Sequence, residues 1–296
     1  MTRTLDADLP ARPAARTTAP GSRMPPASRI MLYAVLVLIA LFFVLPLIWM
    51  VSTSLKAESA VFRDGGFFPA EPTLENFQRI LTAGGQTPVL RYIFNSVGVA
   101  TIGTAVSVIL VSLSGYAFAR IDFRFKSLLF SALITTLLLP GVMFLVPQYL
   151  LMTQLHLLNT WPAFMLPGLA GAFGVFFMRQ FFMSIPVELE EAAYVDGAGR
   201  LRTFVSIILP LAAPAIATLA VISFLGYWND YLWPLITCQG PGCTLAPGLR
   251  NLQGTYSTRF ALLMAGSVIA AVPVLVLYVF SQRYIIQSVT SSGVKG

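Results

Sequence analysis

The sequence predicts an all-α protein, a polytopic transmembrane bundle of about six helical spans. The first observation is composition: 56% of the 296 residues are hydrophobic, 10% are charged, and the mean hydropathy is +0.77. That leaves too little polar surface to cover a water-soluble globule. The second is a series of long apolar windows, which must be helical because lipid cannot satisfy open backbone groups.

The spans follow from the length needed to cross the bilayer. A hydrocarbon core about 30 Å thick takes roughly 20 helical residues. Six windows meet this requirement, at 30–51, 92–118, 127–151, 161–183, 208–236 and 260–281. Residues 1–29, rich in Pro, Ala and Arg, predict a disordered cytoplasmic tail, and residues 30–296 a single transmembrane domain. The first window is long for a signal peptide and lacks a small-residue cleavage site, which indicates an uncleaved anchor.

The positive charges indicate an orientation. The formal net charge of +7 comes from 19 Lys and Arg against 12 Asp and Glu. These cations are spread over many loops, a pattern typical of membrane topology rather than of nucleic-acid binding. Thirteen lie on the side that holds both termini and six on the other. The positive-inside rule therefore predicts that both termini are cytoplasmic and that loops 52–91, 152–160 and 237–259 face outward.

The loop between the fourth and fifth spans predicts a protruding knob of two short helices. Ser184 is expected to cap the first helix, and Gly197 to end it. Its first turn is acidic, with Glu188, Glu190 and Glu191 at the positive end of the helix dipole. An amphipathic helix on the lipid surface is the alternative, but anionic headgroups repel carboxylates. The pattern thus favours docking into the cleft of a partner protein.

The same loop carries a recognisable motif. Glu191-Ala192-Ala193, three residues, Gly197, nine residues and then Ile207-x-Leu209-Pro210 resembles the EAA loop of bacterial ABC importer permeases. The flanking sequence is similar to the carbohydrate branch of that family, the maltose-type inner membrane permeases. The segments that share this likeness are Ile185-Pro186, Asp196-Gly197-Ala198, 147–152, 157–160, Trp228-Asn229-Asp230 and 294–296. The resemblance runs from about residue 30 to the end.

The resemblance implies a type I ABC importer permease in a bacterial inner membrane, with a sugar or oligosaccharide as solute. It implies four further partners: a second permease, two ABC ATPase subunits that bind ATP and Mg²⁺, and an extracytoplasmic sugar-binding protein. The EAA loop, about 184–210, would seat in the ATPase. Glu191 would pair with a basic residue there, the alanines would permit close packing and Gly197 would give the turn. The implied coupling residues are Glu188, Glu191, Ala192, Ala193, Asp196, Gly197 and Ala198.

Several chemistries are missing from the sequence. It has no Gly-x-x-x-x-Gly-Lys-Ser/Thr phosphate loop. A single histidine and two cysteines permit neither a Ser/His/Asp triad nor a four-ligand zinc site. We therefore expect a non-enzymatic subunit without a metal or cofactor of its own.

A polar solute needs a polar path, and the fifth span provides the main candidates. Asp230 is the one ionisable residue expected inside a span, and it follows Tyr227, Trp228 and Asn229. Asn and Asp can bind sugar hydroxyls, and aromatic rings can stack on a pyranose. An interfacial aromatic belt, with Asp230 as a cap or helix partner, is the alternative. Weaker candidates, which could equally bond helix to helix, are Asn95, Ser96 and Gln148.

Small residues and prolines predict the packing of the spans. Close helix contacts, including contact with the second permease, are expected at Gly98, Gly103, Ser107, Ser112 and Gly115. Kinks are expected at Pro140, Pro147, Pro214 and Pro273.

The outer loop at 237–259 has two candidate roles. In the family, the corresponding loop reaches toward the binding protein, which implies contacts from Asn251, Gln253 and Tyr256; a plain surface connector is the alternative. Cys238 and Cys243 lie on the oxidising side, where a disulfide would stiffen the loop. Their spacing permits a bridge but does not require one.

Other transport mechanisms remain alternatives. The near alternative is the same type of importer for another solute, such as a polyamine or glycerol phosphate. A cationic solute would favour more carboxylates than Asp230, and an anionic solute would favour Arg or Lys, which the spans lack. A neutral polyol or oligosaccharide therefore fits best. An ion-coupled secondary transporter would use Asp230 as its titrating group. That hypothesis gives the knob at 184–210 no function, and the sequence lacks the evident inverted repeats of many secondary transporters.

Overall fold

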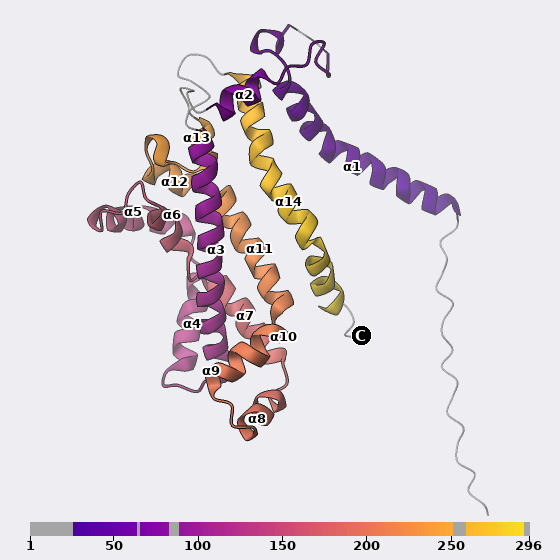
Figure 1. The fold of residues 1–296 in the computed structure, drawn as a ribbon. Helices are drawn as coiled ribbons and strands as arrows, with labels where there is room; N and C mark the ends of the chain where they lie inside the picture. The colour runs from indigo at the N-terminus through magenta and orange to yellow at the C-terminus, as the bar shows by residue number, and fades with distance from the viewer. Residues whose placement is uncertain (1–25, 64–65, 83–88, 251–258, 293–296) are drawn as a thin grey trace, which may run out of the picture. The chain divides into compact units, whose positions relative to one another are not determined.

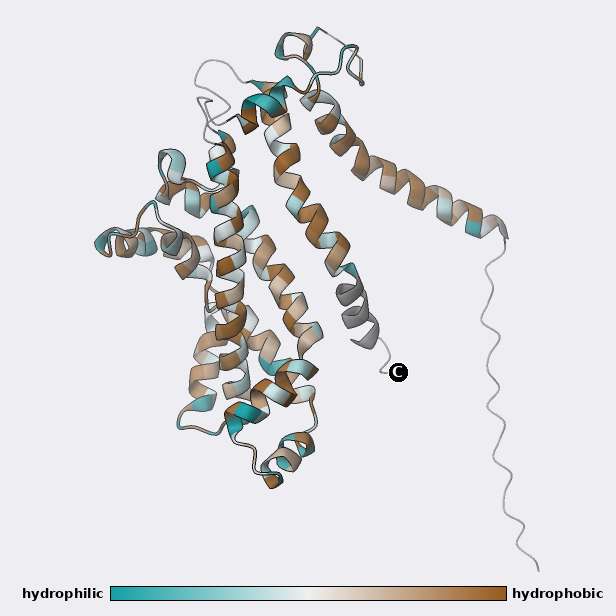
Figure 2. Cartoon of the chain, viewed as in Figure 1, coloured by the Kyte–Doolittle hydropathy of each residue, from teal (hydrophilic) through white to brown (hydrophobic). Residues whose placement is uncertain are grey.

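The computed structural model describes residues 26–63, 66–82, 89–250 and 259–292 (Figure 1). The chain divides into two units, residues 1–47 and 48–296, which are considered separately. The first contains most of helix α1 (Pro26–Ser54), whose side chains from residue 27 to residue 49 are exposed on all sides. Figure 2 shows hydrophobic residues along most of its length. Such a helix suits a lipid environment, since water would not solvate its apolar surface.

The all-helical membrane fold is confirmed, but only three of the described helices are straight candidate spans. Long and apolar enough to cross a bilayer are α1, α3 (Val89–Arg120) and α14 (Phe260–Ser292). Three further candidates are pairs of helices bent at a short break, which brings the total to as many as six. The expectation of continuous helices over 127–151, 161–183 and 208–236 is therefore wrong.

Each broken span has an identifiable break. The first joins α4 (Lys126–Thr136) to η2 (Gly141–Phe144) and α5 (Leu145–Gln154) at 98°. The second joins α6 (Trp161–Met165) and η3 (Leu166–Gly168) to α7 (Ala172–Ser184) at 51°. The third joins 200–211, which comprises α9 (Arg200–Thr203), η4 (Phe204–Ile208) and α10 (Leu209–Leu211), to α11 (Ala213–Asn229) at 78°.

Prolines account for two of these breaks. Pro140 is extended at the first break, and Pro214 lies in the first turn of α11 after the third. A proline cannot donate an intrahelical hydrogen bond and clashes with the preceding turn. The kink expected at Pro147 is wrong, because this residue lies in the first turn of α5. At Pro273 the helix is not interrupted, because α14 continues through this residue.

Helix α3 is the centre of the second unit. It packs along α7 and α11, and α11 also packs on α14 (Figure 1). One buried cluster surrounds its first half and includes Tyr92, Val99, Phe164, Trp228 and Leu245. A second surrounds its last turns and includes Val111, Tyr116, Met178, Phe182 and Phe204. The first cluster takes in α12 (Leu232–Thr237) and α13 (Leu245–Arg250), so α3 links both ends of the unit.

The segment before α3 is tied to the start of α14. The Glu58 carboxylate, in η1 (Glu58–Ala60), accepts hydrogen bonds from the backbone N–H groups of Phe260 and Ala261, at 2.6 and 3.1 Å. These are free donors at a helix N-terminus, where the dipole also favours a negative charge. Helix α2 (Glu75–Leu81) packs on α14 as well, so this segment closes one end of the helix bundle.

Three glycines of α3 make close contacts within this chain. A Cβ on Gly98 would lie 2.2 Å from the Trp161 ring, and one on Gly103 would lie 3.0 Å from the Tyr227 ring. At Gly115 the Cβ would lie 2.8 Å from the Cβ of Met178 and 3.0 Å from the backbone nitrogen of Arg179. These glycines let α3 approach α6, α11 and α7 closely.

We predict that Gly115→Ala lowers the free energy of unfolding by about 1 to 3 kcal/mol, because the new methyl group meets backbone atoms of α7 that cannot rotate away. Thermal unfolding of the detergent-purified protein measures the change. The control is Gly226→Ala in α11, where the new methyl group would meet nothing within 4 Å. This control is expected to be neutral or slightly stabilising. Equal unfolding temperatures for the two variants would contradict the close crossing of α3 and α7.

Candidate functional site

The knob between α7 and α11 consists of α8 (Glu188–Val195), a glycine turn and α9. Gly197 ends α8 with a φ of +80°. Its N–H donates to the carbonyl of Tyr194 and that of Ala198 donates to Ala193, at 3.0 and 2.9 Å, which is the Schellman pattern of helix termination. A Cβ at Gly197 would meet nothing within 4 Å, so the backbone conformation, not space, favours glycine here.

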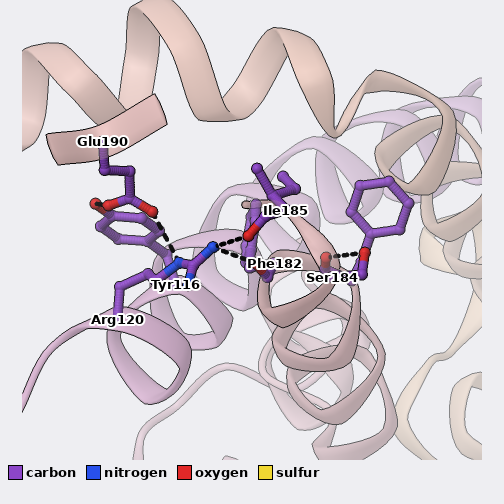
Figure 3. Close-up of polar contacts among 7 residues, drawn as sticks. Tyr116, Arg120, Phe182, Ser184, Ile185 and Glu190 are labelled. Carbon is purple, nitrogen blue, oxygen red and sulfur yellow. Dashed lines mark hydrogen bonds and ion pairs between the residues drawn. The ribbon is translucent and has the colours of Figure 1, made fainter. Parts of the chain in front are cut away.

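The start of α8 differs from expectation. Its N-cap position is Val187, which makes no side-chain cap. Ser184 instead donates its hydroxyl to the carbonyl of Phe181, at 2.7 Å, in the last turn of α7 (Figure 3). The predicted Ser184 cap is wrong because α8 begins four residues later.

The acidic helix has one outward face and one buried face. Among the predicted coupling residues, the exposed ones are Glu188, Glu191, Ala192, Asp196 and Gly197, and Ala198 is half-buried. Exposed apolar side chains accompany them, and Val195 is 88% exposed. Ala193 is buried in the chain itself, so the two alanines of the motif do not share one role. The face with Glu191 is free to meet a partner, whereas Ala193 packs α8 onto the membrane domain.

Glu190 points inward and is 3% exposed. Its Oε1 lies 2.8 Å from Nε of Arg120, and its Oε2 accepts a hydrogen bond from the Tyr116 hydroxyl, also at 2.8 Å (Figure 3). Tyr116 and Arg120 lie one turn apart near the end of α3, so both reach the same carboxylate. We call these three residues the Glu190 clasp.

Arg120 extends the clasp to α7. Its Nη2 donates to the carbonyl of Phe182, at 2.9 Å, and to that of Ile185 (Figure 3). Carbonyls at a helix C-terminus lack intrahelical partners and favour a cation. The guanidinium therefore joins the ends of α3 and α7 to α8 at one point.

The Glu190 clasp is not predicted from the sequence, which indicates a role for Glu190 only at the helix dipole and for Arg120 only in the distribution of positive charge. The available signal was the one-turn spacing of Tyr116 and Arg120, which places a donor and a cation on one face of a helix. Nothing in the sequence connects that face to a residue 70 positions further on.

A cavity of about 580 Å³ lies among α3, α5, α6, α11 and α12. Of the predicted path residues, Gln148, Tyr227 and Asp230 line it. Asp230 is the one charged residue of this lining, which includes amide, hydroxyl and aromatic groups. The remaining lining residues are Ser107, Gly141, Val142, Leu145, Phe164, Pro167, Gly168, Ser223, Gly226, Leu232 and Trp233. Such a lining can bind a polar solute without strong charge.

Asp230 lies in a break between two helices. Helix α11 ends at Asn229, and Asp230 is extended, with φ −64° and ψ 119°. Its carboxylate accepts a long hydrogen bond, 3.4 Å, from the N–H of Trp233 in the first turn of α12. A carboxylate suits this position because it meets the positive end of a helix dipole. Asp230 therefore combines a capping role with a place in the cavity wall.

The neighbours of Asp230 point in different directions. The Tyr227 hydroxyl faces the cavity region and donates to the carbonyl of Met165, at 3.2 Å. Trp228 is buried instead, stacks on Phe224 and donates its indole N–H to the carbonyl of Ala270 in α14. Asn229 is exposed and does not line the cavity. Trp228 and Asn229 do not line this cavity, since successive helical residues point about 100° apart. Their place on the substrate path stays a prediction.

Asn95 has a structural role rather than a place in the cavity wall. Its amide nitrogen donates to the carbonyls of Pro241 and Cys243, at 3.1 and 2.9 Å, and its amide oxygen accepts from the indole of Trp161, at 3.0 Å. These bonds use both donors of the amide and leave it little capacity for a solute. The described contacts thus give Asn95 a structural role, and its place on the solute path stays a prediction.

Asn95 holds a loop that is closed by a disulfide between Cys238 and Cys243. Ser96 accepts a hydrogen bond from the N–H of Leu245, at 2.7 Å, just beyond this loop. On the other side, the Asn159 side chain accepts one from the N–H of Gln239, at 3.0 Å. We call residues 238–243 with these anchors the disulfide loop. It fixes the end of α12 to the start of α3.

The residues predicted to contact the binding protein, Asn251, Gln253 and Tyr256, lie outside the described residues. Within the described part of the chain, no group of three or more His, Cys, Asp or Glu could hold a metal ion.

A bundle of long and broken apolar helices around a cavity with some polar lining groups, with a protruding knob of two short helices, is typical of the membrane-spanning subunit of a transporter. The family model of the binding-protein-dependent transport system inner membrane component matches residues 107–291, and the chain belongs to this family. It is a non-catalytic membrane subunit of a binding-protein-dependent importer. Membership of this family supports an ATP-driven importer over the alternative of an ion-coupled secondary transporter.

Curated relatives cover nearly the whole chain. The arabinooligosaccharides transport system permease protein AraQ of Halalkalibacterium halodurans is 35% identical over 87% of this chain and 93% of its own length. The lactose transport system permease protein LacG of Rhizobium radiobacter is 33% identical over 88% and 94%. The trehalose transport system permease protein SugB of Mycobacterium tuberculosis is 32% identical over 85% and 92%.

A solved structure has the same fold. It is a crystal structure of a bacterial ABC transporter involved in the import of the acidic polysaccharide alginate, and a chain of it matches with a TM-score of 0.76 at 24% identity. The match covers 88% of this protein and 98% of that chain. The expected importer permease fold is therefore confirmed.

We predict that Asn95→Ala lowers the free energy of unfolding by about 2 to 3 kcal/mol, because it leaves two carbonyls and an indole N–H without their partner. Thermal unfolding in detergent measures this. Asn229→Ala is the matched control, since this asparagine is exposed and makes no hydrogen bond within the described residues. Its effect is expected to stay within about 0.5 kcal/mol. If the two variants unfold alike, Asn95 does not anchor the disulfide loop.

Proposed function

We propose that this chain is the permease of an importer for a neutral sugar or oligosaccharide. The cavity carries the proposal, since it offers one carboxylate, an amide, hydroxyls and aromatic rings, and no cation among its lining residues. Such groups bind hydroxyls and the apolar faces of sugar rings. An anionic solute such as glycerol phosphate would need Arg or Lys in the lining. Relatives named for arabinooligosaccharides, lactose and trehalose support a sugar.

The outward face of α8 is the proposed docking site for the ATPase. Glu191 is exposed there beside Glu188, Ala192 and Asp196, with apolar Val195 at the tip. A carboxylate at the centre of such a face can form a directional pair with a basic residue of the ATPase. Ala192 leaves room for the partner, and Gly197 and Ala198 close the turn below it. ATP and its Mg²⁺ belong to that partner.

The proposed orientation places both termini and the knob in the cytoplasm. The Glu190 clasp involves the last turns of α3, and the disulfide loop is held by Asn95 and Ser96 near its start. Arg120 and Asn95 are separated by roughly 35 Å along the helix, about the thickness of the hydrocarbon core. Disulfides persist in oxidising compartments, which supports an outer location for this loop.

The proposed complex contains this chain, a second permease, two ATPase subunits and an extracytoplasmic sugar-binding protein. A second permease would supply a further wall of the solute path. For the binding protein we propose contacts from Asn251, Gln253 and Tyr256, on the basis of the sequence alone.

The proposed function is tested by uptake. The complete complex with its binding protein is placed in membrane vesicles with ATP inside, a protonophore present, and labelled neutral or anionic oligosaccharides outside. We expect uptake of a neutral member of the panel that needs ATP and persists when the proton gradient is collapsed. Uptake limited to anionic members, or lost with the gradient, would contradict the proposal.

We predict that Asp230→Asn raises the apparent KM for the transported sugar roughly tenfold, because a hydrogen bond to a charged acceptor is worth about 1.5 kcal/mol or more. Asn is also a good helix cap, so the break before α12 is kept. Initial uptake rates in the same vesicles give the KM. The control is Asn229→Ala, whose residue lies next in the sequence but outside the cavity lining. An unchanged KM in Asp230→Asn would show that Asp230 serves the fold alone.

A further inference from the structure

One continuous helix reaches all three parts of the candidate site. Helix α3 has 32 residues, which corresponds to about 48 Å. Asn95 and Ser96 hold the disulfide loop, Ser107 lines the cavity, and Tyr116 and Arg120 bind Glu190. A displacement of the Arg120 end is therefore transmitted to the cavity wall along a single rigid element.

Helix α8 has few other attachments to the membrane domain. Its buried residues are Glu190 and Ala193. The clasp that holds Glu190 is itself fixed, because the Tyr116 ring packs on Phe182 and Phe204, with ring centroids 5.8 and 4.6 Å away. Each carboxylate oxygen has its own partner, and the two partners come from one face of α3. Two partners restrict the orientation of the Glu190 carboxylate more than a single partner would.

We propose that Glu190 and Arg120 are positioning residues that make α8 and α3 move as one body. The proposal rests on the proposed function, in which α8 is the helix that docks into the ATPase. The adjacent glutamates then have different tasks: Glu191 binds the ATPase, and Glu190 passes the resulting movement to α3. The Tyr227 ring packs against Gly103 of α3, so the movement also reaches the α11 wall of the cavity.

The test uses ATP as its probe and a cysteine in the cavity wall as its reporter. Ser107→Cys is introduced into the assembled complex in nanodiscs, where the native cysteines are expected to stay unreactive because they form a disulfide. The rate of modification by a polar thiol reagent is measured with and without ATP. We expect ATP to change this rate roughly fivefold or more, the lower end of typical coupling between sites.

The variants are Glu190→Gln, Arg120→Met and their combination, and Asp122→Asn is the control, because this exposed carboxylate follows α3 and lies outside the proposed docking face. Each single change leaves one buried charge unpaired and should lower the unfolding temperature, whereas the double variant should recover much of it. We expect the ATP response of Ser107→Cys to be lost in both single variants and in the double variant. Asp122→Asn should keep it.

Two results would overturn the proposal. One is a single variant that keeps the full ATP response. The other is a double variant that regains the response together with its stability, because the pair would then serve folding only.

A separate measurement distinguishes failure of the proposed function. In Glu191→Gln, co-purification of the ATPase should fall, while in Glu190→Gln it should be retained. If the ATPase co-purifies fully with Glu191→Gln, docking through this residue is wrong. In that case, the ATP response of the Glu190 variants alone decides whether Glu190 is a positioning residue.

Discussion

The buried ion pair between Arg120 and Glu190 is the interaction on which the candidate site depends. Neither charge is tolerated in the interior without the other, since an unpaired buried ion is strongly destabilising. The pair is stabilised further by the Tyr116 hydroxyl and by carbonyls at the end of α7. Because Glu190 is turned inward, the helical repeat turns Glu191 and Glu188 outward. One internal contact therefore determines the face that the knob presents to its partner.

A second constraint comes from the membrane, where open backbone groups are tolerated only if they are buried in protein or line a polar cavity. Breaks in two candidate spans line the same cavity, through Gly141 and Val142 at the first and Pro167 and Gly168 at the second. The third break, at Ala212, is buried in the protein, and Asp230 lines the cavity from a separate break after α11. Discontinuous helices are a common way to build a solute site in a transporter. The irregular segments thus contribute to the cavity wall, while the continuous α3 extends from the cavity to the knob.

The sequence predicted features that depend on local pattern. Apolar length identified the membrane fold, and the spacing from Glu191 to Pro210 identified the loop and the turn at Gly197. It could not predict contacts between distant segments, such as those of Glu190 with α3 or of Asn95 with the disulfide loop. Hydropathy also failed at the breaks, because Pro140, Gly141 and their neighbours are apolar enough to continue a window while their backbones end a helix. Polar residues such as Asn95 were assigned to solute because their internal partners were invisible.

The most direct test of a rigid connection between α8 and α3 is a distance measured in the working complex. Spin labels at Leu189→Cys on α8 and Leu113→Cys on α3 occupy exposed positions, and the native cysteines are joined in a disulfide. Electron paramagnetic resonance then gives the distance distribution between the labels without nucleotide and with ATP trapped. A single body predicts the same distribution in both states, even though the cavity changes its access. A shift of several ångströms between them would show that the Glu190 clasp opens during the cycle, which contradicts the account.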